Sequence, residues 1–218
     1  MRGSPARLLV LATLVSLGAG CAMNKTEKGA IIGAGAGGAA GAVIGNATGA
    51  TVRGAIIGAT VGGVAGAVIG HQMDQQAEEL AYELPGATVQ RVGQGIAVTF
   101  PEGLLFGFDS DQLMPTARDN LRSVAASLEK YPNTRTLIVG HTDSDGSTEY
   151  NMDLSDRRAV SAANLIVAEG IDRTRVCTAG RGEAEPIATN ASAEGRRQNR
   201  RVEIAIYATA ATGGGLGH

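Results

Sequence analysis

The densest cluster of polar side chains lies at residues 140–159, in the sequence GHTDSDGSTEYNMDLSDRRA. It follows an apolar run at 136–139, typical of a central buried strand, and it enters a helix predicted over 153–169. Asp143 lies in the loop, and Arg158 lies near the first turn of the helix. A carboxylate can hold an ammonium group, and a guanidinium can bind a carboxylate through two hydrogen bonds. Asp143 and Arg158 therefore predict a binding site for a zwitterion. The alternative is an ion pair between them that only fastens the loop to the helix.

Two further features bear on the chemistry of this cluster. The positive end of the helix macrodipole is expected to help Arg158 hold an anion. His141 is a candidate base, but no serine or cysteine nucleophile accompanies it, so we expect a solvated loop histidine. The two cysteines, Cys21 and Cys177, have neither zinc-binding nor CxxC spacing. We therefore expect no catalytic residue, no metal and no cofactor.

The elements that position the cluster belong to a predicted α/β domain at residues 87–208. Strands at 88–92 and 96–100 predict a hairpin, 104–108 a short extended piece, and 175–179 and 201–207 two further strands. A helix is expected after Pro115. Strands that alternate with helices indicate a sandwich of βαβ units, a mixed sheet with helices packed on it. The helix residues expected to be buried are Leu121, Val124, Ala125, Leu128, Leu154, Ala162, Leu165 and Ile166.

The composition of the chain argues against a nucleic-acid binder. The chain has 19 basic and 21 acidic residues, and the acidic excess grows when residues 1–20, which hold Arg2 and Arg7 and no acid, are removed. Aromatic residues make up 3% of the chain and tryptophan is absent, so base stacking is not expected.

The N-terminus has the layout of a secretory signal, with two arginines, an apolar core at 8–17 and small residues before Cys21. A cysteine in this place resembles the bacterial lipobox, in which it is acylated and becomes the mature N-terminus. The usual leucine three residues earlier is Gly18 here, with Leu17 one step away. We expect a lipoprotein signal at 1–20, an acylated spacer at 21–27, and sorting to the outer membrane. An ordinary signal peptide is the alternative.

Two glycine-rich repeats follow, at residues 28–45 and 53–70, and they are near copies of each other offset by 25 residues. Glycine at every fourth position places these residues on one helical face, where helices can approach closely. We expect a helical hairpin at 28–70 that enters a membrane or associates between chains; a compact spacer that packs on itself is the alternative. A polar helix and linker at 71–86 and a disordered tail at 209–218 complete the expected organisation.

Several short motifs follow one another along residues 88–207. They are Phe108-Asp109-Ser110-Asp111, Gly140-His141-Thr142-Asp143, Asn151, Leu154-Ser155, Arg158-Ala159, Gly195-Arg196 and Asn199-Arg200-Arg201-Val202-Glu203. In order and approximate spacing these motifs resemble the OmpA-like peptidoglycan-binding domain. The glycine hairpin in front makes the whole chain similar to the YiaD-like outer-membrane lipoproteins.

The resemblance implies a protein that binds, without cleaving, the diaminopimelate of the peptidoglycan stem peptide. Asp143 is expected to hold its ammonium group, Arg158 its carboxylate, and Asn151 its backbone. Thr142, Asp109 and Arg200 are expected to contribute at the edge of the site. The implied partners are peptidoglycan, outer-membrane lipid through Cys21, and further copies of the chain through the glycine zipper, with the C-terminal domain in the periplasm.

Two other functions are alternatives to wall binding. A muramidase or amidase would need positioned carboxylates or a metal triad, and the sequence has no such pattern. The other is a membrane-active, pore-forming or oligomerising protein in which the glycine zipper acts and wall binding only positions it.

Overall fold

The computed structural model describes residues 51–58, 64–107 and 109–208. Within these residues, five strands form one mixed sheet. β3 and β4 pair in parallel, and the other neighbours pair antiparallel. The strands are β1 (Thr88–Val92), β2 (Gly95–Pro101), β3 (Thr134–His141), β4 (Val176–Gly180) and β5 (Arg201–Ala208), in the order β1-β2-β5-β3-β4.

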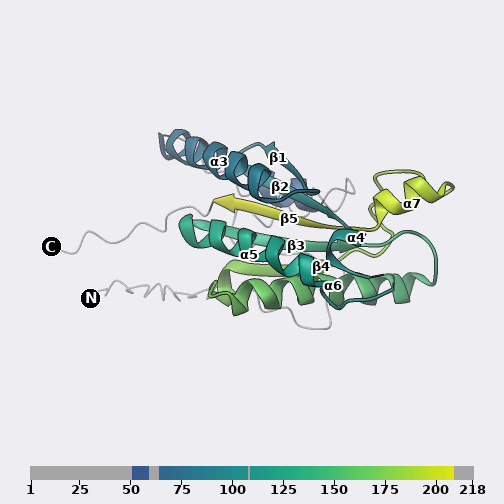
Figure 1. The fold of residues 1–218 in the computed structure, drawn as a ribbon. Helices are drawn as coiled ribbons and strands as arrows, with labels where there is room; N and C mark the ends of the chain where they lie inside the picture. The colour runs from purple at the N-terminus through teal and green to yellow at the C-terminus, as the bar shows by residue number, and fades with distance from the viewer. Residues whose placement is uncertain (1–50, 59–63, 108, 209–218) are drawn as a thin grey trace, which may run out of the picture.

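Both faces of this sheet are buried, because apolar residues occupy successive positions along its inner strands. Helices α3 (Val64–Glu83), α5 (Pro115–Lys130) and α6 (Thr148–Ala168) supply residues to the main core on one face (Figure 1). Helix α2 (Thr51–Gly58) packs on the other face. Shorter helices are α4 (Glu102–Leu105), η1 (Arg173–Arg175) and α7 (Ala193–Asn199).

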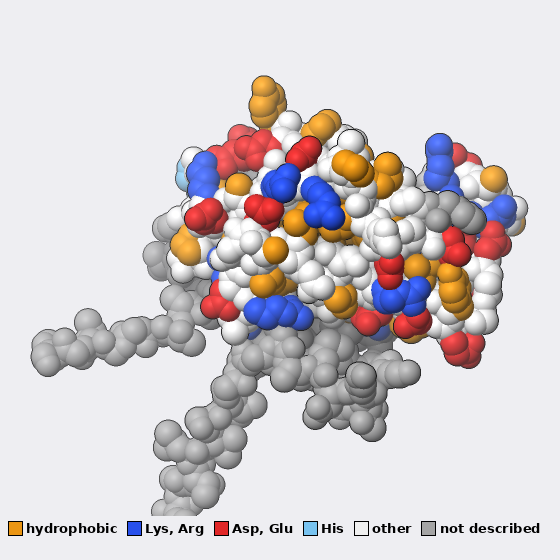
Figure 2. All heavy atoms as spheres, turned by 60° about the horizontal axis from the view of Figure 1, so that its bottom comes forward, with side chains coloured by type: hydrophobic (Ala, Val, Ile, Leu, Met, Phe, Trp, Pro, Cys, Tyr) orange, Lys and Arg blue, Asp and Glu red, His pale blue; other side chains and the backbone are white. Residues whose placement is uncertain are grey.

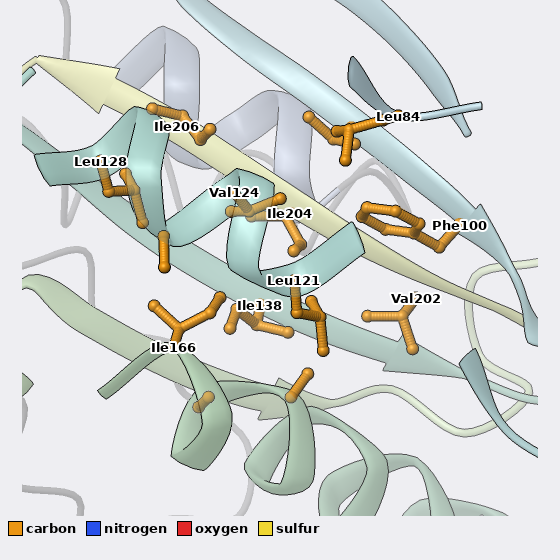
Figure 3. Close-up of a cluster of buried hydrophobic side chains, with 14 of the residues drawn as sticks. Leu84, Phe100, Leu121, Val124, Leu128, Ile138, Ile166, Val202, Ile204 and Ile206 are labelled. Atoms are coloured by element: carbon orange, nitrogen blue, oxygen red, sulfur yellow. The ribbon is translucent and has the colours of Figure 1, made fainter. Parts of the chain in front are cut away.

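The main core is built around the apolar stripe of α5. In Figure 3, Leu121, Val124 and Leu128 project from α5 toward Ile138 of β3 and Ile204 of β5. Each is fully or almost fully buried, and burial of such a side chain contributes about 1.5–3 kcal/mol. This packing fixes α5, and with it the segment between β2 and α5 that borders the site.

A second core lies under α2 on the opposite face. Val52, Ala55 and Ile56 are buried against residues of β3, β4 and β5. The N-terminus of α2 is also held by polar contacts, since the Thr51 backbone N–H and hydroxyl both contact the carboxylate of Glu185. The start of the second glycine repeat is therefore part of the globular domain.

The predicted division before the domain differs from the structure in one respect. α3 runs without a break from Val64 to Glu83, across the expected boundary at residue 70, and its later residues Met73, Leu80 and Leu84, the last just beyond its end, join the main core. Residues 28–50 and 59–63, the signal at 1–20, Cys21 and the tail at 209–218 lie outside the described residues. Among the described helices, none combines the length and apolar character needed to cross a bilayer.

The predicted α/β class is confirmed, and so are the hairpin, the helix after Pro115 and the strands at 136–139, 175–179 and 201–207. Two local predictions were wrong. Residues 102–105 form α4, and only Phe106 makes a bridge, to Leu113, where an extended piece was expected. α6 begins five residues earlier than predicted, at Thr148. On the face shown in Figure 2, basic and acidic side chains lie interspersed.

Candidate functional site

The end of β3 and the start of α6 form one wall of the predicted site. The Ser147 hydroxyl caps α6 by accepting a hydrogen bond from the backbone N–H of Tyr150. β3 and α6 approach closely because residue 140 is glycine: a Cβ there would lie 2.0 Å from the carbonyl oxygen of Ser155. This contact sets where the loop residues and the helix residues of the site lie relative to each other.

Asp143 is buried in the loop, with 6% of its surface exposed. Its Oδ1 accepts a hydrogen bond from the backbone N–H of Asp145 at 3.1 Å. Its Oδ2 accepts one from Nη1 of Arg200 at 2.5 Å. The carboxylate predicted to hold an ammonium group therefore already faces a cation, which the protein itself supplies.

Arg158 lies three turns into α6 and is 2% exposed. Its Nε donates to the carbonyl oxygen of Ser110 at 2.9 Å, and its guanidinium lies 5.5 Å from the centre of the Phe106 ring. The expectation that the helix macrodipole reinforces Arg158 was wrong, because the effect of the dipole fades within the first turn. Charged side chains, and not the helix terminus, set the electrostatics here.

Glu102, which the sequence analysis missed, joins Arg158 to Arg200. Its Oε1 forms a short ion pair with Nη2 of Arg158, and its Oε2 lies 2.6 Å from Nε of Arg200. The Glu102 backbone N–H also donates to the carbonyl oxygen of Arg200, at 3.0 Å. Arg158, Glu102, Arg200 and Asp143 thus form a series of alternating charges. Pro101-Glu102-Gly103 carries no motif, so no local signal could have identified this residue.

The pKa of Arg200 depends on its burial and on the two acids that it contacts. Burial lowers its pKa, but the hydrogen bonds and charges of Asp143 and Glu102 outweigh burial and raise the pKa overall. Arg200 is therefore charged at neutral pH, and it links the two halves of the site.

Thr142 and Asn151 hold the loop that carries Asp143. The Thr142 hydroxyl donates to the carbonyl oxygen of Asp143 at 2.9 Å, and Nδ2 of Asn151 donates to the same oxygen at 3.2 Å. Asn151 Nδ2 also donates to Oε2 of Glu183 at 2.7 Å. Both residues are buried, so in this state they position Asp143. The structure thus brings together Asp143, Thr142, Asn151 and Arg200 directly, and Arg158 through Glu102.

Asp109 lies at the outer edge of the site. It is exposed, its carboxylate contacts the Tyr150 hydroxyl, and its φ of 53° is uncommon for a residue other than glycine. The next residue, Ser110, supplies the carbonyl oxygen that binds Arg158. The Asp109–Tyr150 contact therefore fastens this segment to α6 beside Arg158.

His141 is not the solvated loop residue that was expected. It ends β3, is 1% exposed, and pairs in register with Arg201 of β5. Burial lowers its pKa well below the usual value, and the charges of Arg201 and Arg181 add to the effect. Glu203 lies 4.0 Å from His141 Nε2 but is held by Arg201, so desolvation and the arginines prevail. A neutral, buried histidine on the α2 face cannot act on a ligand at Asp143.

A groove of about 650 Å³ adjoins the charge series on its outer side. Its lining comes from the end of β2, from α4 and from α7, and it includes Glu102, Phe106 and Arg200. Ile187, an exposed apolar residue, also lines it. Glu102 therefore borders Arg158 and Arg200 on one side and the groove on the other.

Comparison with known proteins identifies the family of the domain. Residues 105–200 match the model of the OmpA family, and residues 1–74 match that of the YMGG-like Gly-zipper. The chain is 40% identical over 138 residues to the probable lipoprotein YiaD of Escherichia coli K12, covering 62% of this chain and 63% of that protein. It is 42% identical over 103 residues to the peptidoglycan-binding protein ArfA of Mycobacterium tuberculosis, covering 47% of this chain and 32% of that protein.

A solved structure gives the same result for the fold. The cell wall anchor of the T6SS from Pseudomonas aeruginosa is 32% identical, with a TM-score of 0.53, and the match covers 64% of this chain and 96% of that one. The chain spans less than two thirds of the length of the curated relatives named above. The predicted resemblance is confirmed: residues 105–200, which contain Asp109, Asp143, Asn151, Arg158 and Arg200, form a domain of the OmpA family, and a Gly-zipper segment precedes it.

Proposed function

We propose that this chain is a non-enzymatic outer-membrane lipoprotein that binds peptidoglycan through the diaminopimelate of the stem peptide. Acyl chains on Cys21 anchor it, and the domain tethers the membrane to the cell wall from the periplasmic side. The observation that carries the proposal is the placement of Asp143 and Arg158 at the two ends of one buried charge series.

Diaminopimelate suits this arrangement because its free end carries an ammonium and a carboxylate on one carbon. Asp143 binds the ammonium, and Arg158 binds the carboxylate through its planar fork. Arg200 lies between the two acids, with Thr142 and Asn151 behind the loop and Asp109 at the rim. The relative named as a peptidoglycan-binding protein supports the choice of ligand class.

Weak binding suffices for a tether. A hydrogen bond to a charged group contributes about 1.5–3 kcal/mol, and desolvation and lost entropy offset part of this. A lipid anchor holds the domain beside the wall at an effective concentration on the order of millimolar. Single contacts can then open and close while many molecules keep the two layers together.

The glycine repeats admit two roles within this proposal. The segment at 28–50 either enters the outer membrane or pairs with the same segment of other chains, which would make the protein a homo-oligomer. The start of the second repeat is engaged elsewhere, because Val52 and Ile56 are buried on the sheet. We therefore place any membrane-inserting or associating function in the first repeat.

The test is sedimentation with purified peptidoglycan, using residues 21–218 with Cys21→Ser so that the protein is soluble. α2 and α3 must be kept, because both contribute to the cores. Asp143→Asn removes the charge that holds the ammonium, and Arg158→Lys keeps a charge opposite Glu102 but loses the fork. Glu149→Gln, an exposed change in the first turn of α6, is the matched control.

We expect the wild type and Glu149→Gln to sediment with the wall, and both site variants, shown to fold by thermal melts, to stay in solution. Equal binding by all four proteins would assign wall binding to another surface. If none binds, the glycine-zipper function becomes the better proposal, and conductance across lipid bilayers is the measurement that would test it.

A further inference from the structure

Arg158 has no free surface on which a ligand could bind. The side chain is 2% exposed, and the Ser110 carbonyl oxygen occupies its Nε. Its Nη2 faces the carboxylate of Glu102. Any carboxylate that binds to Arg158 must therefore take the place of a group that already lies there, and of the two partners just named, Glu102 is the one that is itself a carboxylate.

The pairing of Glu102 with Arg158 is incomplete. Nη2 of Arg158 is buried and close to Oε1 of Glu102, yet within the described residues it meets no acceptor with hydrogen-bond geometry. The other oxygen of Glu102 is directed to Arg200 instead, at 2.6 Å. Glu102 thus divides its carboxylate between two arginines and offers neither of them the two-oxygen pairing that a guanidinium favours.

We propose that Glu102 is an internal substitute for the carboxylate of the ligand: it neutralises Arg158 in the free protein and leaves when the carboxylate of the ligand binds. This inference rests on the proposed function. The ligand carboxylate, brought in by the ammonium at Asp143, can present both oxygens to Arg158, whereas Glu102 presents one.

The structure leaves room for Glu102 to move. Its backbone is fixed, since its N–H, just beyond the end of β2, donates to the carbonyl oxygen of Arg200, just before β5. Its side chain borders the groove of about 650 Å³ described above, which also meets Arg197 of α7. Rotation of the side chain alone moves the carboxylate from Arg158 and Arg200 to this groove, where water and the Arg197 guanidinium can solvate it.

The exchange has a consequence for specificity. A ligand with a free carboxylate replaces one charged pair by another, so the buried arginine is never left without a partner. A ligand whose carboxylate is amidated brings no charge, and to bind it must either leave Glu102 in place or expose Arg158 to an uncharged group. Glu102 therefore acts as a specificity-determining residue that disfavours amidated diaminopimelate.

The experiment measures binding of two soluble peptidoglycan fragments, one with free and one with amidated diaminopimelate, by calorimetry. It uses residues 21–218 with Cys21→Ser and compares wild type, Glu102→Gln and the charge control Glu149→Gln. We expect Glu102→Gln to bind the free-acid fragment at least about threefold more tightly and to discriminate less against the amide. Glu149→Gln should match the wild type in both respects.

A second variant guards against a folding defect. Glu102→Gln leaves a buried guanidinium with a weaker partner, so its Tm should be lower than that of the wild type, and the free-acid fragment should raise it more. Glu102→Asp keeps the charge but is too short to reach both arginines, and it too should bind the fragment more tightly.

Two outcomes would overturn the inference. Weaker or unchanged binding by folded Glu102→Gln and Glu102→Asp would mean that Glu102 positions Arg158 for the ligand and does not compete with it. Unchanged discrimination against the amide would remove the proposed specificity role. Both outcomes leave the proposed function intact, whereas a wild type that binds neither fragment nor intact peptidoglycan would overturn the proposed function itself.

Discussion

Arg200 Nη1 lies 2.5 Å from Oδ2 of Asp143, so the acid at the centre of the site is ion-paired before any ligand arrives. The same guanidinium binds Glu102 through Nε, on the other side. Two largely buried carboxylates therefore share one arginine that is about a quarter exposed. Arg200 has a structural role in addition to its expected place at the edge of the ligand site.

Arg200→Gln should destabilise the domain by about 1–3 kcal/mol, because it leaves Asp143 and Glu102 with reduced compensation. This loss of stability is smaller than the loss expected for a fully buried ion pair, because solvent screens the exposed part of Arg200. Urea unfolding measures the loss. Arg197→Gln is the control: Arg197 lies nearby on α7 but is exposed and pairs with exposed Glu194, so a change below about 0.5 kcal/mol is expected. Equal losses in the two variants would contradict the bridging role.

Gly140→Ala should disrupt the wall between β3 and α6. The new Cβ would lie 2.0 Å from the Ser155 carbonyl oxygen, and the backbone of α6 would have to move. We expect a loss of at least about 2 kcal/mol in stability and weaker peptidoglycan binding, since the position of Asp143 relative to Arg158 depends on this contact. Gly103→Ala is the matched control, because a Cβ at residue 103 meets nothing within 4 Å. A Gly140→Ala protein with unchanged Tm and binding would show that α6 tolerates displacement.

Most of the fold could be predicted from the sequence because its signals are local. The hairpin, the helix after Pro115 and the buried strand at 136–139 each follow from periodicity and turn residues within a single segment. Asp143 and Arg158 could be found because both lie in one short polar segment of the sequence, at residues 140–159. The start of α6 was missed because Ser147 was not recognised as its N-cap.

The remaining features depend on contacts between distant residues. Glu102 reaches Arg158 and Arg200 across 56 and 98 positions of the chain, and no pattern around it reports those partners. The docking of α2 on the sheet could not be predicted from the sequence either. Its Thr51 contacts Glu185, 134 residues away, and the glycine spacing around it favoured a membrane zipper. His141 was misjudged because the sequence alone did not show that β3 extends to it or that α2 covers that face.

His141 should make stability depend on pH. Its pKa in the folded protein is depressed by burial, Arg201 and Arg181, so between that pKa and the unfolded value near 6.5 only the unfolded state binds the proton. Stability should be constant above pH 6.5 and fall below it, by up to about 1.4 kcal/mol per pH unit. Thermal melts from pH 8 to 5 measure this. His141→Phe should have the shallower slope, while His71→Gln, an exposed histidine of α3, should keep that of the wild type.

The docking of α2 should depend on Val52. Val52→Glu places a carboxylate at a position that is 2% exposed, and it should cost more than about 2 kcal/mol or release the helix from the sheet. The first repeat has Glu27 at the corresponding position, so it is less suited to the same place on the sheet. Amide hydrogen exchange over residues 51–58 should accelerate in Val52→Glu. It should stay slow in Arg53→Glu, which makes an equal substitution at the exposed neighbour. Fast exchange in the wild type would contradict docking.

Lipid anchoring requires that the Cys21 sulfur is bound to a lipid through a thioether. In a Gram-negative host, the mature protein should start at Cys21, show the mass of the lipid modification and fractionate with the outer membrane; Cys21→Ser should abolish all three. Cys177 lies in β4, and Cys21 is the only other cysteine of the chain. A sulfur that is part of a thioether cannot also form a disulfide, so acylation of Cys21 and a Cys21–Cys177 disulfide exclude each other. Peptide mapping without reductant separates them: a Cys21–Cys177 disulfide in protein isolated from the cell would rule out the anchor and leave peptidoglycan binding without a tether.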